Sequence, residues 1–335
     1  MNKQWVEPDI RDNVVETMIS YKALTGMPTR NLLFYAGLSV GKFYDWHKRY
    51  GVPNQSQQQV PKAHWLLDWE KSMIIAYYRQ HEYEGEGYRR LCYRMIDEDV
   101  VYASPSSVYR VLKEANLLNK FKPCPESNQK GRGYVQPTRA HQEWHLDISY
   151  VNVLGTFLFL IAIIDGYSRY IVAYDLRASM QEADVEIVLQ RAHEKYPNEQ
   201  PRVISDRGSQ FISKEFNAYI RNVGLTHTLI SVGYPQSNGK LERFFGTAKR
   251  ECIRRNSFLS IEDARKIIDQ FIEYYNNKRL HSAIDYVAPL DILLGRKDEI
   301  LKRRDEKLKK AREDRVKYYN QNSTLFHDAK VSCFR

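Results

Sequence analysis

Three carboxylates, each in a different kind of local sequence, are the residues of this chain best suited to chemistry. Asp147 lies in the alternating run Trp144–Tyr150, which is typical of a strand. Asp206 ends a short apolar run, and Glu242 lies just inside a helix predicted to begin near Asn238. Hard divalent cations take oxygen ligands from several elements, and two such ions about 3.5–4 Å apart stabilise both the attacking and the leaving oxygen of a phosphodiester displacement. The pattern therefore predicts a catalytic metal site.

Each carboxylate also has an ordinary structural interpretation. Asp147 could pair with an arginine inside the core, Asp206 could cap a turn, and Glu242 could be a solvated helix residue. Asn238 precedes Glu242 by four residues and Lys249 follows it by seven, so a helix of 3.6 residues per turn has all three on about one face. A stripe of amide, carboxylate and ammonium suits a metal-bound phosphate, and we favour the catalytic interpretation for this reason.

The composition predicts a folded protein with a polyanionic partner. Of the 335 residues, 43% are hydrophobic and 27% are charged, which allows roughly two to four folded units. The formal net charge of +10 indicates nucleic acid, although a merely soluble basic protein would show the same balance. No apolar run is long enough to span a membrane, no signal core follows Met1, and the four cysteines have no paired spacing. We expect a cytoplasmic protein without membrane contact.

Residues 1–53 are predicted to form a helix-turn-helix. Apolar residues recur there at helical spacing, and Ser39 is suitably placed to cap the second helix. That helix could enter a DNA major groove, with Lys42, Lys48 and Arg49 as its contacts. The alternative is a small helical bundle with a solvated basic face.

A polar linker leads into a second helical segment, and the whole stretch occupies residues 54–118. Ser104, followed by a proline, predicts the start of its last helix. Aromatic residues and arginines alternate in this segment, and Arg89 and Arg110 are the predicted phosphate contacts. The tyrosines could equally pack a helical core. A basic linker at residues 119–139 joins this segment to the rest of the chain.

The chain ends in a basic helix and tail at residues 296–335. Basic residues outnumber acidic residues over 296–317, and such a mixture favours a long exposed helix with ion pairs between successive turns. Its role stays open between a solvated helix, a DNA contact and subunit association. Apolar residues are too sparse for a convincing coiled coil.

Residues 140–295 alternate strands and helices. Three strands joined by glycine-containing turns are followed by helix, strand, helix, strand and a long helix. The predicted strands are 144–153, 156–165, 168–175, 201–205 and 226–231, and the predicted helices are 185–193, 213–223 and one from Asn238.

Five blocks of this segment together resemble a known family. They are Trp144–Tyr150, Ile163–Tyr174, Ser205–Phe211, Gly233–Glu251 and Tyr274–Pro289. In this order they resemble the catalytic core of the retroviral-integrase superfamily, and within it the bacterial insertion-sequence transposases of the Asp-Asp-Glu type. The resemblance covers residues 140–295.

The resemblance implies an α/β fold and its chemistry. The core would be ribonuclease H-like, with a mixed five-stranded sheet and flanking helices, and neighbouring strands would bring Asp147 and Asp206 together across from Glu242. These three would be the catalytic residues and the ligands of two divalent cations, Mg²⁺ or alternatively Mn²⁺. Lys249 would hold DNA phosphate, and Asn238 would order its loop or touch DNA. Water as nucleophile would give strand cleavage, and a DNA 3′-hydroxyl would give strand transfer.

Other residues that match the family pattern are interpreted as structural. We expect Asp165 to organise a turn or to serve packing, and not to bind metal. Asn276, Arg279 and His281 are expected to close the last helix of the core, although Arg279 could also meet DNA.

The leading hypothesis is a DNA transposase that cuts and joins the ends of its own mobile element. Its partner would be double-stranded DNA at the element ends and at the target, bound by a homodimer or higher oligomer in the bacterial nucleoid. No clear zipper heptads are evident, so a small upstream helix-turn-helix and leucine-zipper protein could be a further partner. The rival hypotheses are a ribonuclease H-like nuclease that only hydrolyses, and a DNA-binding regulator that has lost catalysis.

Overall fold

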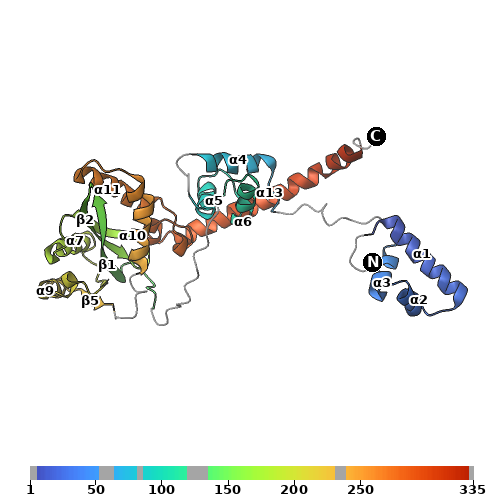
Figure 1. The fold of residues 1–335 in the computed structure, drawn as a ribbon, viewed down its shortest axis with the longest axis horizontal. Helices are drawn as coiled ribbons and strands as arrows, with labels where there is room; N and C mark the ends of the chain where they lie inside the picture. Colours follow the sequence, from blue (N-terminus) through green and yellow to red (C-terminus); the bar gives the residue numbers. More distant parts are fainter. Residues whose placement is uncertain (1–5, 53–63, 81–85, 119–134, 231–238, 332–335) are drawn as a thin grey trace. The chain divides into compact units, whose positions relative to one another are not determined.

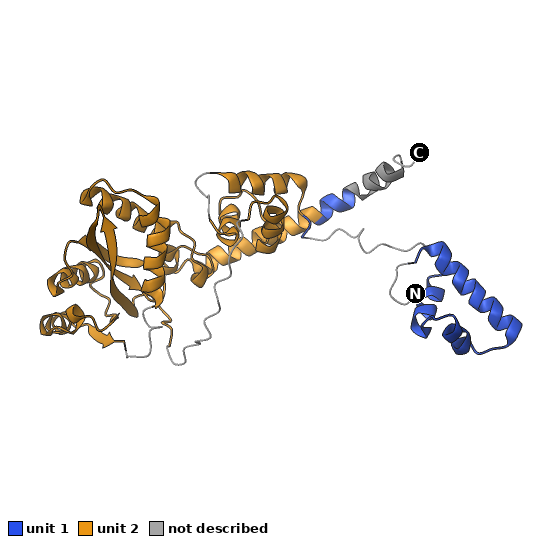
Figure 2. Ribbon diagram, viewed as in Figure 1, with its two compact units in different colours: residues 1–65, 316–335 blue, residues 66–315 orange. Residues whose placement is uncertain are grey.

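The computed structural model describes residues 6–52, 64–80, 86–118, 135–230 and 239–331, with side chains as far as residue 321. The chain divides into two units (Figure 1, Figure 2). The first comprises residues 1–65 and 316–335, and the second comprises residues 66–315. The domain boundaries expected from the sequence stay predictions.

Three helices begin the first unit: α1 (Pro8–Thr25), α2 (Thr29–Tyr35) and α3 (Val40–Lys48). They enclose a small cluster of Val15, Leu33, Leu38, Phe43 and Trp46. The Ser39 side chain accepts a hydrogen bond from the Lys42 amide, so Ser39 caps α3 as predicted. The turn before it includes Gly37 at φ 64°, a conformation that favours glycine. Helices α2 and α3 thus form the expected helix-turn-helix.

Three helices open the second unit: α4 (Asp68–Arg79), α5 (Tyr88–Asp97) and α6 (Pro105–Glu114). We call them the tri-helical module. Their apolar faces meet in one cluster that includes Ile74, Leu91, Met95 and Leu112. The Ser104 side chain accepts a hydrogen bond from the Ser107 amide and so begins α6 as the sequence predicts.

The second unit contains a mixed five-stranded sheet flanked by helices (Figure 1). Its strands are β1 (Glu143–Val153), β2 (Thr156–Asp165), β3 (Ile171–Arg177), β4 (Arg202–Ser205) and β5 (Thr226–Leu229). The strand order is β3-β2-β1-β4-β5. The β1–β2 and β2–β3 pairs are antiparallel, whereas β1–β4 and β4–β5 are parallel. The sheet has the form expected of a ribonuclease H-like core.

Helices pack against both faces of this sheet. They are α7 (Glu182–Lys195), α8 (Ser209–Ile212), α9 (Lys214–Asn222), α10 (Gly239–Glu251) and α11 (Ile261–Asn277). One face carries Val151 and Val153 of β1 and packs against α10 and α11; we call it the α10 face. The opposite face carries Trp144 and Leu146 and packs against α7, α8 and α9. Because side chains alternate along a strand, the odd-numbered residues of β1 belong to the α10 face.

The third strand begins later than the predicted range 168–175. The Asp165 carboxylate accepts hydrogen bonds from the Ser168 amide and hydroxyl at 2.7 and 2.6 Å, and Arg169 has a φ of 68°. These contacts hold the chain in a turn, so extended structure starts only at Ile171. They also agree with the interpretation of Asp165 as a turn residue.

The last helix, α13 (Lys297–Val331), follows three short segments: η4 (Ile253–Arg255), η5 (Ser282–Ile284) and α12 (Pro289–Leu293). Its part in the second unit packs against the tri-helical module. Arg304 donates hydrogen bonds of 2.8 and 2.6 Å to Asp97, and Arg315 donates one of 2.7 Å to Glu70. Some of its basic residues therefore form internal ion pairs. None of the helices that the structure describes is long and apolar enough to cross a membrane.

The substitution Arg315→Ala should strongly destabilise the second unit. Glu70 is 4% exposed, and removing its partner leaves a buried carboxylate unpaired, at a cost of about 3–5 kcal/mol. As a control, Arg296→Ala removes an exposed pair with Asp291 and should cost less than about 1 kcal/mol. Urea denaturation of the full chain measures both effects. Equal losses would contradict the buried pair's predicted role.

Candidate active site

Asp147 lies in β1, and Asp206 is the first residue after β4, the parallel strand beside β1. The last paired residues of β1 and β4 are His145 and Ile204, and extending this register by two residues would bring Asp147 opposite Asp206. Adjacent strands are about 4.8 Å apart, and residues in register point to the same face. Asp147 also pairs with Ala162, which lies in the cluster on the α10 face. Asp147 therefore belongs to that face.

Backbone hydrogen bonds orient the two aspartates. Asp147 Oδ1 accepts from the Ile148 amide at 2.8 Å, and Asp206 Oδ1 accepts from the Gly208 amide at 2.9 Å. Asp147 is half-buried and Asp206 is exposed. Each of these bonds uses one carboxylate oxygen, so capping a turn does not exclude metal binding at Asp206.

A partly buried polar chain starts at Ser205, next to Asp206, on the opposite face of the sheet from α10. Ser205 Oγ is 2.8 Å from His227 Nε2, and His227 Nδ1 is 3.3 Å from Asn217 Oδ1. Burial lowers the pKa of His227, which favours the neutral ring. Asn217 donates through its amide nitrogen to the Ser213 carbonyl oxygen at 2.8 Å, so its own oxygen faces the ring. No local sequence pattern indicates this chain, because its members are far apart in sequence.

Helix α10 carries Glu242 in its first turn. Its apolar face, Leu241, Phe244, Phe245 and Ala248, is buried against the α10 face of the sheet. Glu242 is exposed, as expected for a residue outside that apolar face. Within the described ranges, no three His, Cys, Asp or Glu side chains lie close enough together to hold a metal ion. The described structure therefore does not gather the three carboxylates into one cluster.

Lys240 is a charged residue of this region that the sequence analysis missed. A Cβ built on Gly166 would lie 3.1 Å from Lys240 Nζ and 3.0 Å from His145 Nε2, so glycine leaves the space that the lysine uses. Burial lowers the pKa of Lys240 to about 7, and the charge of Arg169 acts in the same direction. In the sequence, the one feature that could have indicated a buried Lys240 is Gly166, and a glycine there is equally typical of an ordinary turn.

The other predicted residues of this helix are only partly described. Lys249 is half-buried in the last turns of α10, on about the same helix face as Glu242. Asn238 lies outside the described residues. Its position relative to the carboxylates stays a prediction.

The predicted DNA contacts lie on helices of both units. In α3 and its cap, Lys42 Nζ is 4.8 Å from the centroid of the Trp46 ring, Arg49 forms an ion pair with Asp45, and Lys48 is exposed. These contacts leave Lys48 as the best candidate for a phosphate contact in the first unit.

The tri-helical module divides its arginines between two environments. Arg89 on α5 and Arg110 on α6 are exposed, as a DNA contact requires. Arg90 and Arg94 are instead in contact with acidic and tyrosine side chains of the second unit. In the segment where aromatic residues and arginines alternate, some arginines therefore pack against other side chains and others present their charge to solvent.

Comparison with known proteins identifies the class of this fold. The integrase core domain family matches residues 137–235 and, through a second description of the same name, residues 223–289. These ranges contain the five strands and all three carboxylates. The second unit is therefore built around an integrase-type catalytic core.

Three relatives extend the match to proteins of bacterial mobile elements. The transposase for insertion sequence element IS904 of Lactococcus lactis is 33% identical over 49% of this chain and 69% of its own length. An uncharacterized protein of insertion element IS136 from Agrobacterium fabrum is 31% identical over 48% of this chain and 88% of its own length. An uncharacterized 31 kDa protein of insertion element IS600 from Shigella sonnei is 29% identical, covering 76% and 94%. The chain belongs to the bacterial insertion-sequence transposases of the Asp-Asp-Glu type, the family whose general activity is DNA transposition.

The substitution Gly166→Ala should destabilise the core, because the new methyl group would meet His145 and Lys240 at 3.0–3.1 Å. We expect a loss of about 1–3 kcal/mol from overpacking. Gly246→Ala is the matched control, because an added Cβ in this exposed part of α10 meets nothing within 4 Å. It should gain about 0.5–1 kcal/mol. Thermal unfolding distinguishes the two, and a neutral Gly166→Ala would argue against close packing around the lysine.

Proposed function

We propose that this chain cleaves DNA at the ends of its own mobile element and joins the cut strands to a target, with Asp147, Asp206 and Glu242 as catalytic carboxylates. The supporting observation is the parallel register of β1 and β4, which would bring the two aspartates opposite each other if it continued two residues beyond its last pair. The helix on that face carries Glu242 in its first turn. Two strands and a helix thus offer carboxylates to one side of the sheet.

The donor set suits hard divalent cations. All three side chains offer carboxylate oxygens, which Mg²⁺ prefers, and Mn²⁺ accepts the same ligands. Asp147 and Asp206 would hold the cations, and Glu242 would join them after a shift of the start of α10. Two such cations, when bound, acidify the attacking hydroxyl group and neutralise charge on the leaving oxygen.

The chain's own residues would position DNA for in-line displacement. Lys249, on about the same face of α10 as Glu242, would bind a DNA phosphate and hold it beside the carboxylates. Asn238 would order the loop before α10 or touch DNA. With water as nucleophile the product is a cut strand, and with a DNA 3′-hydroxyl group it is a joined strand.

Double-stranded DNA at the element ends and at the target is the proposed partner. Exposed basic residues of the helix-turn-helix and of the tri-helical module, above all Lys48, Arg89 and Arg110, would contact its phosphates. Because two element ends must be joined, we propose a homodimer or higher oligomer on DNA. A small upstream helix-turn-helix and leucine-zipper protein is a further proposed partner.

Replacing any of the three carboxylates by its amide should abolish the reaction. With Mg²⁺ and DNA carrying the element ends, the native chain should give cut and joined strands. Asp147→Asn, Asp206→Asn and Glu242→Gln should each lower the rate by about 10³-fold or more, because an amide binds a cation poorly and carries no charge. DNA binding, measured by gel shift, should persist.

The matched control is Glu262→Gln, which changes an exposed glutamate on α11 and should leave the rate unchanged. Activity of Glu242→Gln at the native rate would refute the site. Cut strands without joined strands would favour a nuclease that only hydrolyses. DNA binding without any product under Mg²⁺ or Mn²⁺ would favour a DNA-binding regulator.

Lys48→Ala should lower the affinity for DNA and make that affinity less dependent on salt concentration. Each phosphate contact contributes about 0.9 to the slope of log affinity against log salt concentration, and Lys48 is exposed. Arg49→Ala should have a smaller effect, because Asp45 already balances part of that charge. Lys22→Ala on α1 is the control outside the helix-turn-helix. Equal salt-dependence slopes for Lys48→Ala and Lys22→Ala would exclude Lys48 of α3 as a phosphate contact.

A further inference from the structure

Helix α10 has a carboxylate at each end. Glu242 lies in its first turn and Glu251 is its last residue. The apolar face between them is fixed in the core cluster on the α10 face. A helix is stiff over this length, so a contact that holds one end also limits where the other end can lie.

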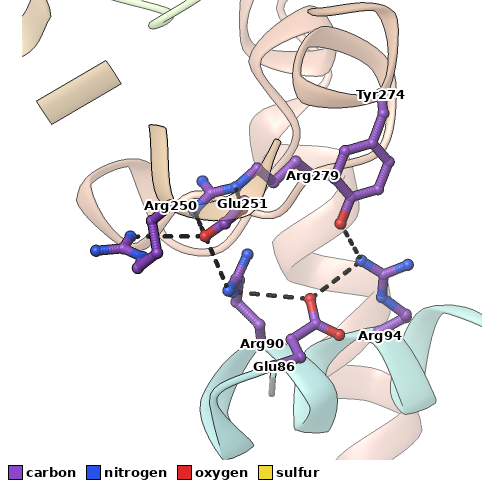
Figure 3. A network of polar contacts seen from close by, with 7 residues as sticks. All are labelled: Glu86, Arg90, Arg94, Arg250, Glu251, Tyr274 and Arg279. Atoms are coloured by element: carbon purple, nitrogen blue, oxygen red, sulfur yellow. Dashed lines mark hydrogen bonds and ion pairs between the residues drawn. The ribbon is translucent and has the colours of Figure 1, made fainter. Parts of the chain in front are cut away.

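A carboxylate at the C-terminal end of a helix is unfavourable, because the helix dipole is negative there. Arginines offset this cost at Glu251 (Figure 3). Arg279 donates two hydrogen bonds of 2.7 and 2.9 Å, and Arg90 lies 3.4 Å away. Burial alone would raise the pKa of Glu251, but the hydrogen bonds and charge of Arg279, with the charges of Arg90 and Arg250, lower it to about 2. Glu251 is therefore ionised at every physiological pH.

One of these arginines comes from the tri-helical module. Arg90 lies on α5, and Arg94, one turn further along, donates hydrogen bonds to Glu86 at 3.2 Å and to the Tyr274 hydroxyl on α11 at 3.3 Å (Figure 3). One side of α5 therefore contacts α10 and α11. Arg89, the neighbouring residue on α5, is exposed.

Helix α13 also connects α5 with the core. Arg304 donates two hydrogen bonds to Asp97, the last residue of α5, and another of 2.8 Å to the Tyr286 carbonyl oxygen. The Tyr93 and Tyr286 rings stack at 4.8 Å. These contacts restrict the movement of α5 relative to the core. A displacement of α5 would therefore be transmitted to Glu251 through the Arg90 contact.

We propose that Glu251 is a positioning residue that joins the tri-helical module to the catalytic helix, so that DNA held by the module sets the position of Glu242. This inference rests on the proposed function of the carboxylates. The three carboxylates are not gathered in the described structure, and Glu242 is exposed, so the position of α10 matters for completing the site. Arg279 holds Glu251 within the core, and Arg90 connects it to the module.

The first experiment compares full-length Glu251→Gln and Arg90→Ala with the native chain at saturating DNA. Both should lower the strand-transfer rate about ten-fold and raise the Mg²⁺ concentration for half-maximal rate several-fold, while DNA affinity stays within about two-fold. A merely structural role would reduce the active fraction without changing the Mg²⁺ requirement. Arg191→Ala, which removes the ion pair between the exposed Arg191 on α7 and the half-buried Asp175 on β3, is the control and should change neither.

Conservative variants keep the proposal testable if the first ones fold poorly. Arg90 makes a single contact with Glu251, so Arg90→Lys should restore the rate and the Mg²⁺ requirement. Arg279 makes two parallel hydrogen bonds, which a lysine cannot reproduce, so Arg279→Lys should not restore them. Native behaviour of Arg90→Ala and Glu251→Gln, or equal behaviour of the two lysine variants, would overturn the proposal.

Hydrogen exchange of the metal-free protein separates this inference from the proposed function. Amides of α10 should exchange several-fold faster in Glu251→Gln and Arg90→Ala than in the native chain. Faster exchange in a chain that yields no DNA product would refute the proposed activity and leave the link between α5 and α10 standing. Unchanged exchange would refute the link, whatever the activity.

Discussion

Parallel pairing of β1 with β4 is the constraint on which the candidate site depends. The last recorded pair is His145 with Ile204, and the same register continued by two residues would have the two aspartates opposite each other. Shifting β4 by one residue would turn its side chains to the other face of the sheet, where Val203 would lose its place among Trp144 and Leu146. The apolar core thus enforces the register on which the proposed site depends.

Helix α10 depends on the same packing in a different way. Its apolar face is buried on the sheet, so its polar residues are left for the solvent side and the site. Packing of one face fixes the rotation of a helix about its axis more firmly than it fixes the positions of the two helix ends. The contacts of Glu251 with arginines supply a constraint at one end, whereas the residues before Gly239 lie outside the described ranges.

Much of the positive charge of this chain is used inside the second unit. Arg279, Arg304 and Arg315 are almost fully buried, and each is paired with a carboxylate. Buried ion pairs fix geometry well, because losing one partner leaves the other unsatisfied. The count of 51 lysines and arginines therefore overstates the number of basic residues available to a polyanion, although these ion pairs leave the net charge of +10 unchanged. Arginines that contact DNA cannot be told from arginines that hold the fold by composition alone.

The sequence by itself determined the family, the order of strands and helices, and the caps at Ser39 and Ser104. These features depend on local spacing and on motifs, which a linear sequence displays directly. Which arginines are buried, where β3 begins, and what surrounds Lys240 and Glu251 became known only from the folded chain. Such features depend on contacts between residues distant in the chain, as when Arg90 meets Glu251. No local pattern encodes them, because each residue of the pair has an ordinary sequence context.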